Sequence, residues 1–353
     1  MTAASHRHYL VIFNPTARGH RPRRLEAAVA ALESAGVTVT VVSTEGPFHA
    51  EELARTANGR FTAVLAAGGD GTAHEVANGL MARPAPLALG ILPYGTANCL
   101  ARELGLPLSP AAAAAFLAHG NTVEVPLGQA AHAGGTRHFL VMLGAGFDAH
   151  VVARLPPDLK RRLGGLAYAL ECLRTWAVSQ GGVYELSLDG HRIRVGQAVI
   201  ANGHYYGGRM VLAPAASIYQ AGLWACLFER SERWRALRYL TWSVLGRLQR
   251  LPDYRLSKAT SVGLIGPAGS PVQCDGEIIG TMPMEIAVSP RPLPLLVPVR
   301  PATGRRRQAA TGRPMPAAAR DGRPRPCGGR GSIQAGWRRH LVRPVEPDGR
   351  CFP

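Results

Sequence analysis

Five consecutive residues, Gly68, Gly69, Asp70, Gly71 and Thr72, have the types and the spacing that phosphate chemistry requires. They stand between an apolar run at 61–67, which predicts a buried strand, and a predicted helix. Glycines let backbone N–H groups approach an anion closely, and a helix N-terminus favours negative charge. The run therefore predicts a phosphate cradle in which Asp70 binds Mg²⁺ or an orienting donor. A tight Asp-Gly turn without a ligand is the alternative.

Two other glycine-bearing loops follow predicted strands. Residues 92–98 (LPYGTAN) lead into a helix, with Thr96 and Asn98 as neutral hydrogen-bonding groups at its start. Residues 14–19 (NPTARG) follow the apolar run at 9–13. Because the carboxyl ends of parallel strands meet at one edge of a sheet, where α/β proteins bind ligands, we expect the three loops to form one site.

A pair of carboxylates, Asp275 and Glu277, flanks Gly276 directly after a short strand-like run at 272–274. Such a pair can supply a base and a metal-binding or orienting group for a hydroxyl nucleophile. A hairpin turn with the sequence Asp-Gly-Glu and no chemical role is the alternative.

The elements before about residue 125 alternate between strand and helix patterns. The strand-like runs are 9–13, 38–42, 61–67 and 87–92, and helical patterns occupy 23–35, 50–57 and the segments that follow Thr72, Asn98 and Ser109. This alternation predicts a parallel, doubly wound α/β sheet.

After about residue 125, short strand-like runs separated by turn residues predict a mostly antiparallel β domain. The runs are 138–143, 183–188, 192–200, 222–228, 261–265, 272–274 and 284–288, and the domain is expected to close at 294–299. Two helical patterns interrupt it, at 158–177 and 232–250, each with an apolar face beside basic residues. Such helices usually pack on a core, and a membrane surface is the alternative for both.

The charge of the chain, formally +17, is unevenly distributed. Residues 300–353 hold 13 arginines against three acidic residues, a net of +10, and their richness in Arg, Pro and Gly predicts a disordered basic tail. Such a tail can contact an anionic membrane or stay solvated; it lacks a nucleic-acid-binding motif, so no nucleic-acid partner is expected. Because no apolar stretch of about 18 residues and no signal peptide is present, a cytoplasmic protein is predicted. The six cysteines form no Cys-x-x-Cys pair, which argues against zinc.

The motifs occur in the order NPTARG, GGDGT–H–E–VANGL, LPYGTANCLARELGLP, LGAGFDAHV and CDGE. In this order and approximate spacing they resemble the diacylglycerol-kinase catalytic family, most closely its bacterial soluble lipid kinases and more distantly the sphingosine kinases. The resemblance implies a nucleotide-binding α/β domain at 8–125, of the phosphofructokinase and NAD-kinase type, and a β-sandwich domain at 126–299 that carries the DGE motif. The basic tail at 300–353 lies outside it.

The resemblance also implies an activity, the ATP-dependent phosphorylation of a lipid hydroxyl on diacylglycerol, a sphingoid base or a related lipid. The residues implied in ATP contact are Asn14, Thr44, Gly68, Gly69, Asp70, Gly71, Thr72, Gly95 and Thr96, with Glu75 supporting the site. Asp70 is the implied partner of the Mg²⁺ that accompanies ATP. Asp275 and Glu277 are implied as the catalytic carboxylates; the family favours the glutamate as proton acceptor, and the aspartate is an equally good chemical candidate.

The sequence departs from the family pattern at two places. His74 stands where the family usually has Asn, and Gln220 stands where relatives typically carry an Asp that helps to hold a second, structural Mg²⁺. Gln220 keeps open a relative that binds lipid or nucleotide without catalysis. The GGDGT motif alone would also fit another kinase, such as an NAD kinase or a phosphofructokinase relative.

Overall fold

The structure is a computed structural model that describes residues 7–298 except 18, 20, 157–158, 160–162 and 179–181. The predicted basic tail at 300–353 lies outside the described residues, as does part of the helix predicted at 158–177.

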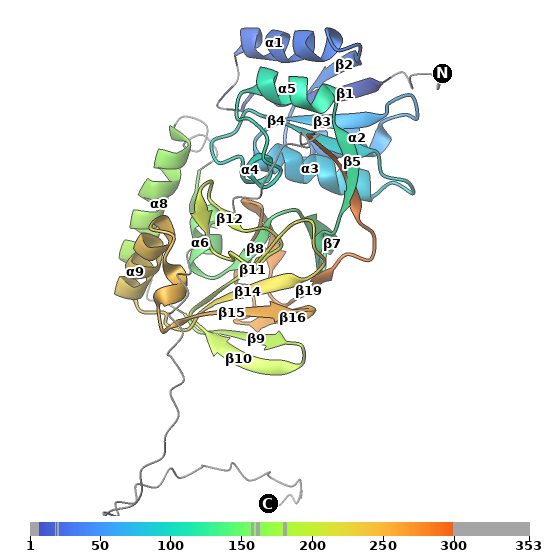
Figure 1. Cartoon of the computed structure of the whole chain (residues 1–353). Coiled ribbons are helices and arrows are strands. Elements are labelled where there is room, and N and C mark those ends of the chain that lie inside the picture. The colour runs from blue at the N-terminus through green and yellow to red at the C-terminus, as the bar shows by residue number, and fades with distance from the viewer. Residues whose placement is uncertain are drawn as a thin grey trace, which may run out of the picture. The chain divides into compact units, whose positions relative to one another are not determined.

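The first sheet has six strands in the order β2-β1-β3-β4-β20-β5 (Figure 1). Their bounds are β1 (His8–Phe13), β2 (Thr38–Ser43), β3 (Ala63–Gly68), β4 (Ala88–Pro93), β5 (Asn121–Val125) and β20 (Leu293–Val297). Strands β2, β1, β3, β4 and β20 run parallel, and β5 pairs antiparallel with β20. Every residue of β3 and β4 is buried, as expected for parallel strands covered on both faces. The predicted parallel α/β sheet is confirmed.

Five helices accompany this sheet: α1 (Pro22–Glu33), α2 (His49–Thr56), α3 (Asp70–Met81), α4 (Cys99–Glu103) and α5 (Pro110–Ala118). Both α1 and α5 begin with proline at a first-turn position, where its missing N–H costs nothing. Helix α1 packs against α5, and α2 packs against α3. In Figure 1, α1 and α5 lie above the sheet and α3 lies below it, so helices cover both faces.

The second part of the chain forms two antiparallel six-stranded sheets packed face to face. One has the order β10 (His191–Val195), β9 (Tyr184–Leu188), β16 (Ser261–Gly266), β19 (Met284–Val288), β6 (Gly128–His132) and β7 (Gly135–Phe139). The other has the order β15 (Tyr254–Ala259), β14 (Leu223–Phe228), β11 (Gln197–Ala201), β8 (Met142–Ala145), β17 (Pro271–Cys274) and β18 (Glu277–Thr281). Their inward side chains share one core, to which Leu186 and Ile286 come from the first sheet and Ile200 and Leu227 from the second. A short ribbon of β12 (Tyr205–Tyr206) and β13 (Met210–Val211) lies beside them.

Two runs predicted as single strands are each two strands in different sheets. The run at 138–143 ends β7, crosses to the other sheet and begins β8; the run at 192–200 spans β10 and β11 in the same way. At the second crossing, a Cβ on Gly196 would lie 2.3 Å from the backbone oxygen of Arg230. The residues next to each crossing, 139–142 and 195–196, are buried, so the strand-like pattern continued through both and periodicity could not reveal the break.

The last strand corrects the expectation that residues 294–299 close the β-sandwich. Strand β20 instead lies between β4 and β5 of the first sheet, so the chain returns to the α/β part at its end. The domain limits 8–125 and 126–299 stay a prediction, with this strand as an exception to them.

Within the described residues, the second part has the helices α6 (Phe147–Arg154), α8 (Gly165–Val178) and α9 (Arg233–Val244), followed by the 3₁₀ turn η1 (Leu248–Arg250). Helices α8 and α9 correspond to the two predicted inserts, and they lie side by side on one flank in Figure 1. Among the helices of the described residues, none is both long and apolar enough to cross a bilayer.

Candidate active site

The three glycine-bearing loops meet at the carboxyl edge of the first sheet, as predicted. The backbone N–H of Tyr94 donates to the oxygen of Gly68 over 2.8 Å, and the N–H of Gly19 donates to the oxygen of Tyr94 over 2.9 Å. The N–H of Asn14 donates to the oxygen of Ala67 over 3.0 Å. Each loop is therefore held by backbone bonds to a neighbouring strand end.

Two of the loops touch backbone to backbone at Gly69 and Gly95. A Cβ on Gly95 would lie 2.5 Å from the Cα of Gly69, and a Cβ on Gly69 would lie 3.3 Å from the Cα of Gly95. Asn98 has a left-handed φ of 49°. Its side chain folds back so that Nδ2 donates to the oxygen of Gly95 and Oδ1 accepts its N–H. The amide of Asn98 thus shapes the loop, whereas Thr96 is exposed.

Thr72 and Asn14 join the other pair of loops. The Nδ2 of Asn14 donates to the buried Oγ1 of Thr72 over 3.1 Å, and the Oδ1 of Asn14 accepts from the N–H and hydroxyl of Thr16. A Cβ on Gly68 would lie 2.3 Å from Oγ1 of Thr72, so this position accepts only glycine without rearrangement. Contacts between the two loops therefore explain why Asn14, Gly68 and Thr72 have these residue types.

Asp70 points toward the start of α4. Its Oδ1 accepts the N–H of Leu100 over 3.2 Å. Burial, with a smaller effect from the charge of Asp275, raises the pKa of Asp70 to about 6 against the opposing effect of the N–H donors of residues 98–100. This carboxylate ties the GGDGT loop to the loop that precedes α4, and its role toward Mg²⁺ stays a prediction.

Glu75 lies behind the loops, and Thr44 lies at the carboxyl end of β2. Glu75, on α3, accepts the N–H of Ala50 at the start of α2 over 3.2 Å, which supports the site from behind. Burial raises the pKa of Glu75, and the charge of Glu277 raises it as well, so these two carboxylates lie within electrostatic reach. Thr44 follows β2 and donates its N–H to the oxygen of Phe13.

Asp275 and Glu277 have separate environments although they are neighbours in sequence. Asp275 is 6% exposed, and its two oxygens accept the N–H groups of Leu140 (2.8 Å), Val141 (3.0 Å) and Met142 (3.0 Å). These donors lie at the crossing from β7 to β8, which sequence reasoning treated as continuous strand. A carboxylate held by three backbone donors is a structural anchor with little capacity left for a substrate proton.

The remaining acceptor capacity of Asp275 is directed at His74 on α3. The Nδ1 of His74 lies 3.3 Å from Oδ2 of Asp275, and its Nε2 lies 3.4 Å from Nδ2 of Asn78. Asn78 also donates to the backbone oxygen of His138 and accepts its N–H over 2.9 Å. Asn78 was not singled out from the sequence; its place one helical turn after His74 was the available signal.

Glu277 reaches the glycine loop. A Cβ on Gly71 would lie 2.7 Å from Oε1 of Glu277, so the carboxylate lies against the first turn of α3. Its side chain is half-buried. The structure therefore brings Glu277 and the GGDGT loop together and turns Asp275 away to an anchoring role.

A second layer of polar residues supports the DGE turn, and sequence reasoning did not identify it. Gln273 accepts the N–H of Gly276 with Oε1 over 2.9 Å and donates Nε2 to Oδ2 of Asp148 over 3.1 Å. Burial raises the pKa of Asp148 to about 6. A Cβ on Gly144 would lie 1.9 Å from this carboxylate, which explains a glycine at that position.

Two more contacts connect the α/β part with the β-sandwich. Arg137 of β7 forms a bidentate ion pair with Glu51 of α2, with both N–O distances 2.8 Å. Glu103 of α4 accepts the N–H of Tyr205 over 2.7 Å, and its other oxygen lies 2.9 Å from Nδ1 of His204. These polar contacts therefore join α2 and α4 of the α/β part to residues of the second part.

Gln220, which stands at the usual aspartate position, is exposed and donates its N–H to the oxygen of Ser217. Within the described ranges, no group of three or more His, Cys, Asp or Glu side chains is arranged to hold a metal ion. The second Mg²⁺ site of relatives stays unassigned in this chain.

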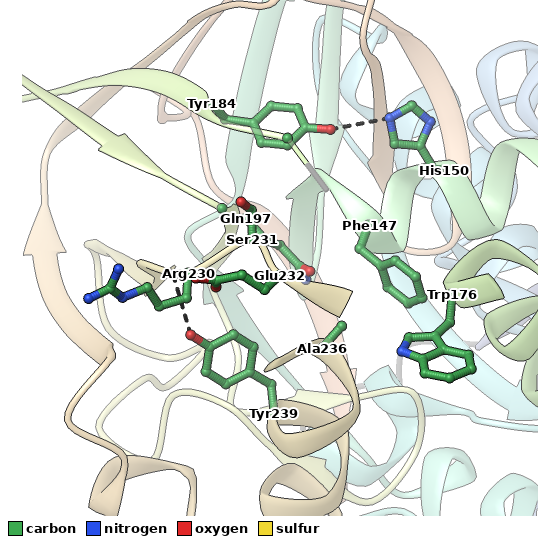
Figure 2. A pocket seen from close by; sticks show the side chains of 12 residues that line it. Phe147, His150, Trp176, Tyr184, Gln197, Arg230, Ser231, Glu232, Ala236 and Tyr239 are labelled. Carbon is green, nitrogen blue, oxygen red and sulfur yellow. Dashed lines mark hydrogen bonds between the residues drawn. The ribbon is translucent and has the colours of Figure 1, made fainter. Parts of the chain in front are cut away.

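A small cleft lies in the second part of the chain, between α6, α8, α9 and the sandwich. Its volume is about 80 Å³, and Phe147, His150, Trp176, Tyr184 and Tyr239 are among its lining residues (Figure 2). The hydroxyl of Tyr184 lies 3.2 Å from Nε2 of His150. None of the predicted site residues lines it, and its volume is below the roughly 300 Å³ of an ordinary ligand pocket.

Comparison with known proteins agrees with this architecture. The sequence profile described as "Diacylglycerol kinase catalytic domain" matches residues 8–130, and that described as "YegS C-terminal NAD kinase beta sandwich-like domain" matches residues 141–297. The chain is 37% identical over 200 residues to "Probable lipid kinase YegS-like" of Pseudomonas aeruginosa, covering 55% of this chain and 64% of that protein. It is 33% identical over 223 residues to the protein of the same name from Yersinia pestis, covering 60% of this chain and 71% of that one.

A solved structure described as a diacylglycerol kinase from Bacillus anthracis superposes with a TM-score of 0.66, over 82% of this chain and 96% of that one. At 23% identity this likeness shows the shared fold. A glycine-loop α/β domain followed by this β-sandwich defines the diacylglycerol kinase-like class. The chain belongs to the family of YegS-like lipid kinases and diacylglycerol kinases. It matches just under two thirds of the length of the Pseudomonas relative.

Proposed function

We propose that this protein transfers the γ-phosphoryl group of ATP to the hydroxyl of a membrane-derived lipid, with Glu277 as the proton acceptor. The observation that supports this most directly is the contact of Glu277 with Gly71. It brings a carboxylate of the β-sandwich to the helix N-terminus of a glycine loop, where a phosphate and an attacking hydroxyl have to meet.

The close approach of the two glycine loops at Gly69 and Gly95 gathers their backbones at one helix N-terminus, an arrangement that suits the phosphates of a nucleoside triphosphate. In the proposal, backbone N–H groups of Gly69 to Thr72 and of Thr96 hold the phosphates, and Gly95, whose own N–H donates to Asn98, lines the cradle with its backbone. Asn14 fixes Thr72 in place, Glu75 holds α2 behind the loops, and Thr44 lines the end of β2. Mg²⁺ bound with ATP neutralises phosphate charge, and Asp70 is the residue proposed to lie nearest to it.

Glu277 then accepts the hydroxyl proton as the oxygen of the lipid forms its bond to phosphorus and ADP leaves. Asp275 does not take part in proton transfer in this proposal, because its oxygens already accept three N–H groups. It orients the turn, so that Glu277 faces Gly71.

The test is an assay of the purified chain with labelled ATP, Mg²⁺ and a total lipid extract, with the labelled product identified by mass spectrometry. A phosphorylated lipid that disappears with Glu277→Gln supports the proposal. Labelled NADP formed from NAD in a parallel reaction would favour the NAD-kinase alternative. No labelled product from either acceptor, in a protein that still binds ATP, would favour a non-catalytic binding protein.

A further inference from the structure

Helices α8 and α9 turn their apolar side chains outward. Leu166 and Leu173 of α8 are 65% and 58% exposed, and Trp234, Leu237 and Val244 of α9 are 55%, 50% and 68% exposed. Together with Leu170 we call these side chains the α8–α9 surface. Spacings of three, four and seven residues place them on one face of each helix, and the two helices pack side by side (Figure 1).

The opposite face of α8 shows that this exposure is systematic. The buried residues of α8 are Ala167, Glu171 and Thr175, with the hydroxyl of Thr175 donating to Glu171 over 3.4 Å. The helix thus buries small and polar groups and exposes leucines, the reverse of a helix that packs on a core. The interpretation that its leucines pack on a core is therefore wrong for Leu166, Leu170 and Leu173.

The surface is bordered by positive charge. Arg247 and Arg250, directly after α9, are exposed, and Arg174 on α8 has a 60% exposed side chain although its guanidinium lies 3.8 Å from Glu171. Residues 232–250 contain five arginines and one carboxylate, Glu232. Arg235 and Arg238 contact Asp253, whereas Arg247 and Arg250 are directed to solvent. Apolar side chains bordered by arginine are the composition of helices that lie in a membrane interface.

The same helix reaches the candidate active site. A Cβ on Gly165, the first residue of α8, would lie 3.5 Å from Cγ2 of Thr96. A Cβ on Gly276 of the DGE turn would lie 3.7 Å from the hydroxyl of Tyr168. Leu166 therefore lies within one helical turn of residues beside both the glycine loop and the DGE turn.

We propose that the α8–α9 surface is a docking site for an anionic lipid bilayer, with its apolar side chains inserted at the acyl-chain boundary and its arginines at the phosphate level. Charge favours an anionic bilayer over two other occupants, the segment at 300–353 and a second copy of the chain. The segment at 300–353 has a net charge of +10, and a second copy would present the same arginines, so both would meet like charge. The proposal extends the proposed function and rests on it only for the idea that the bilayer supplies the substrate.

The test measures binding of the full chain to vesicles of phosphatidylcholine and phosphatidylserine without ATP, at low and at high salt. The triple variant Trp234→Gln/Leu237→Gln/Val244→Gln keeps good helix formers and the charge. It is expected to weaken binding about 10- to 100-fold at both salt concentrations, because apolar insertion is not screened. The matched control is Val41→Gln/Leu108→Gln/Phe116→Gln, three exposed apolar residues of the α/β part, which should bind like wild type.

Two further readouts separate insertion from adsorption through the basic tail. Lipids with a quencher in the acyl chain should quench Trp234, so the quenchable signal should fall in Trp234→Phe. Arg247→Gln/Arg250→Gln should weaken binding about fivefold per arginine at low salt and have little effect at high salt.

Unchanged vesicle binding by the triple variant would overturn the proposal. So would light scattering that shows a wild-type dimer and a monomeric triple variant, because the surface would then be an interface between two copies. Turnover of a short-chain, water-soluble diacylglycerol by the triple variant should equal that of wild type. If no lipid is phosphorylated but vesicle binding depends on the surface as expected, the proposed function fails and the docking site stands.

Discussion

His74 and Asp275 are in contact, with Nδ1 and Oδ2 3.3 Å apart, although 201 residues separate them in the sequence. Both side chains are 2% exposed. His74 lies on the helix that begins in the GGDGT loop, and Asp275 lies on the turn that carries Glu277. The contact therefore sets the position of the candidate base relative to the candidate phosphate loop.

Glu277→Gln is expected to lower kcat about 10²–10⁴-fold, the usual loss when a general base is removed, and to leave ATP affinity near wild type. Steady-state kinetics and ATP titration check this. The control is Glu285→Gln, which changes an exposed glutamate of β19 in the β-sandwich and should keep full activity. Near-normal turnover of Glu277→Gln would remove Glu277 from the role of base.

Asp275→Asn is expected to destabilise the protein by about 1–3 kcal/mol or more, because an amide nitrogen replaces an oxygen that accepts buried N–H groups. Glu277→Gln should cost less stability than Asp275→Asn, because its half-buried side chain accepts none of these three N–H groups, so chemical unfolding of the two variants separates an anchor from a base. Equal stability of both, with equal loss of activity, would contradict the anchoring role.

His74→Ala combined with Asp275→Asn should show coupling. If the imidazole and the carboxylate stabilise each other, the double variant loses less than the sum of the single variants, by about 0.5–3 kcal/mol. Unfolding free energies of all four proteins give this value. Strict additivity would mean that the 3.3 Å contact has no energetic weight.

Gly95→Ala is expected to weaken ATP binding and lower the melting temperature, because its Cβ would lie 2.5 Å from the Cα of Gly69. Gly59→Ala is the matched control, since a Cβ there meets nothing within 4 Å. Thermal unfolding with and without ATP measures both effects. A fully stable Gly95→Ala protein with unchanged ATP affinity would show that close approach of the two loops is not required.

Asp148→Asn should change how stability depends on pH. The folded-state pKa of Asp148 is raised from the ordinary 3.8 to about 6. Its contribution is therefore fully present below pH 4 and is lost as pH rises through 6. Relative to the variant, wild type should lose on the order of 2–3 kcal/mol across this interval. Urea unfolding at several pH values tests this, and parallel pH profiles of the two proteins would contradict it.

The parallel α/β sheet and the three loops at its carboxyl edge follow from local patterns in the sequence. Strand runs, glycines and proline-initiated helices are local signals, and parallel strands leave few other arrangements. The residues of GGDGT and DGE were found for the same reason, since a few adjacent residue types suffice to suggest phosphate and proton chemistry.

The different roles of Asp275 and Glu277 cannot be read from the sequence and depend on contacts with distant residues. The choice depends on three N–H groups at 140–142, more than 130 residues away, and on the contact of Glu277 with Gly71. The same kind of long-range packing places β20 in the first sheet and leaves the leucines of α8 exposed. Periodicity shows that a helix has an apolar face, but which face is buried depends on what the rest of the chain packs against it.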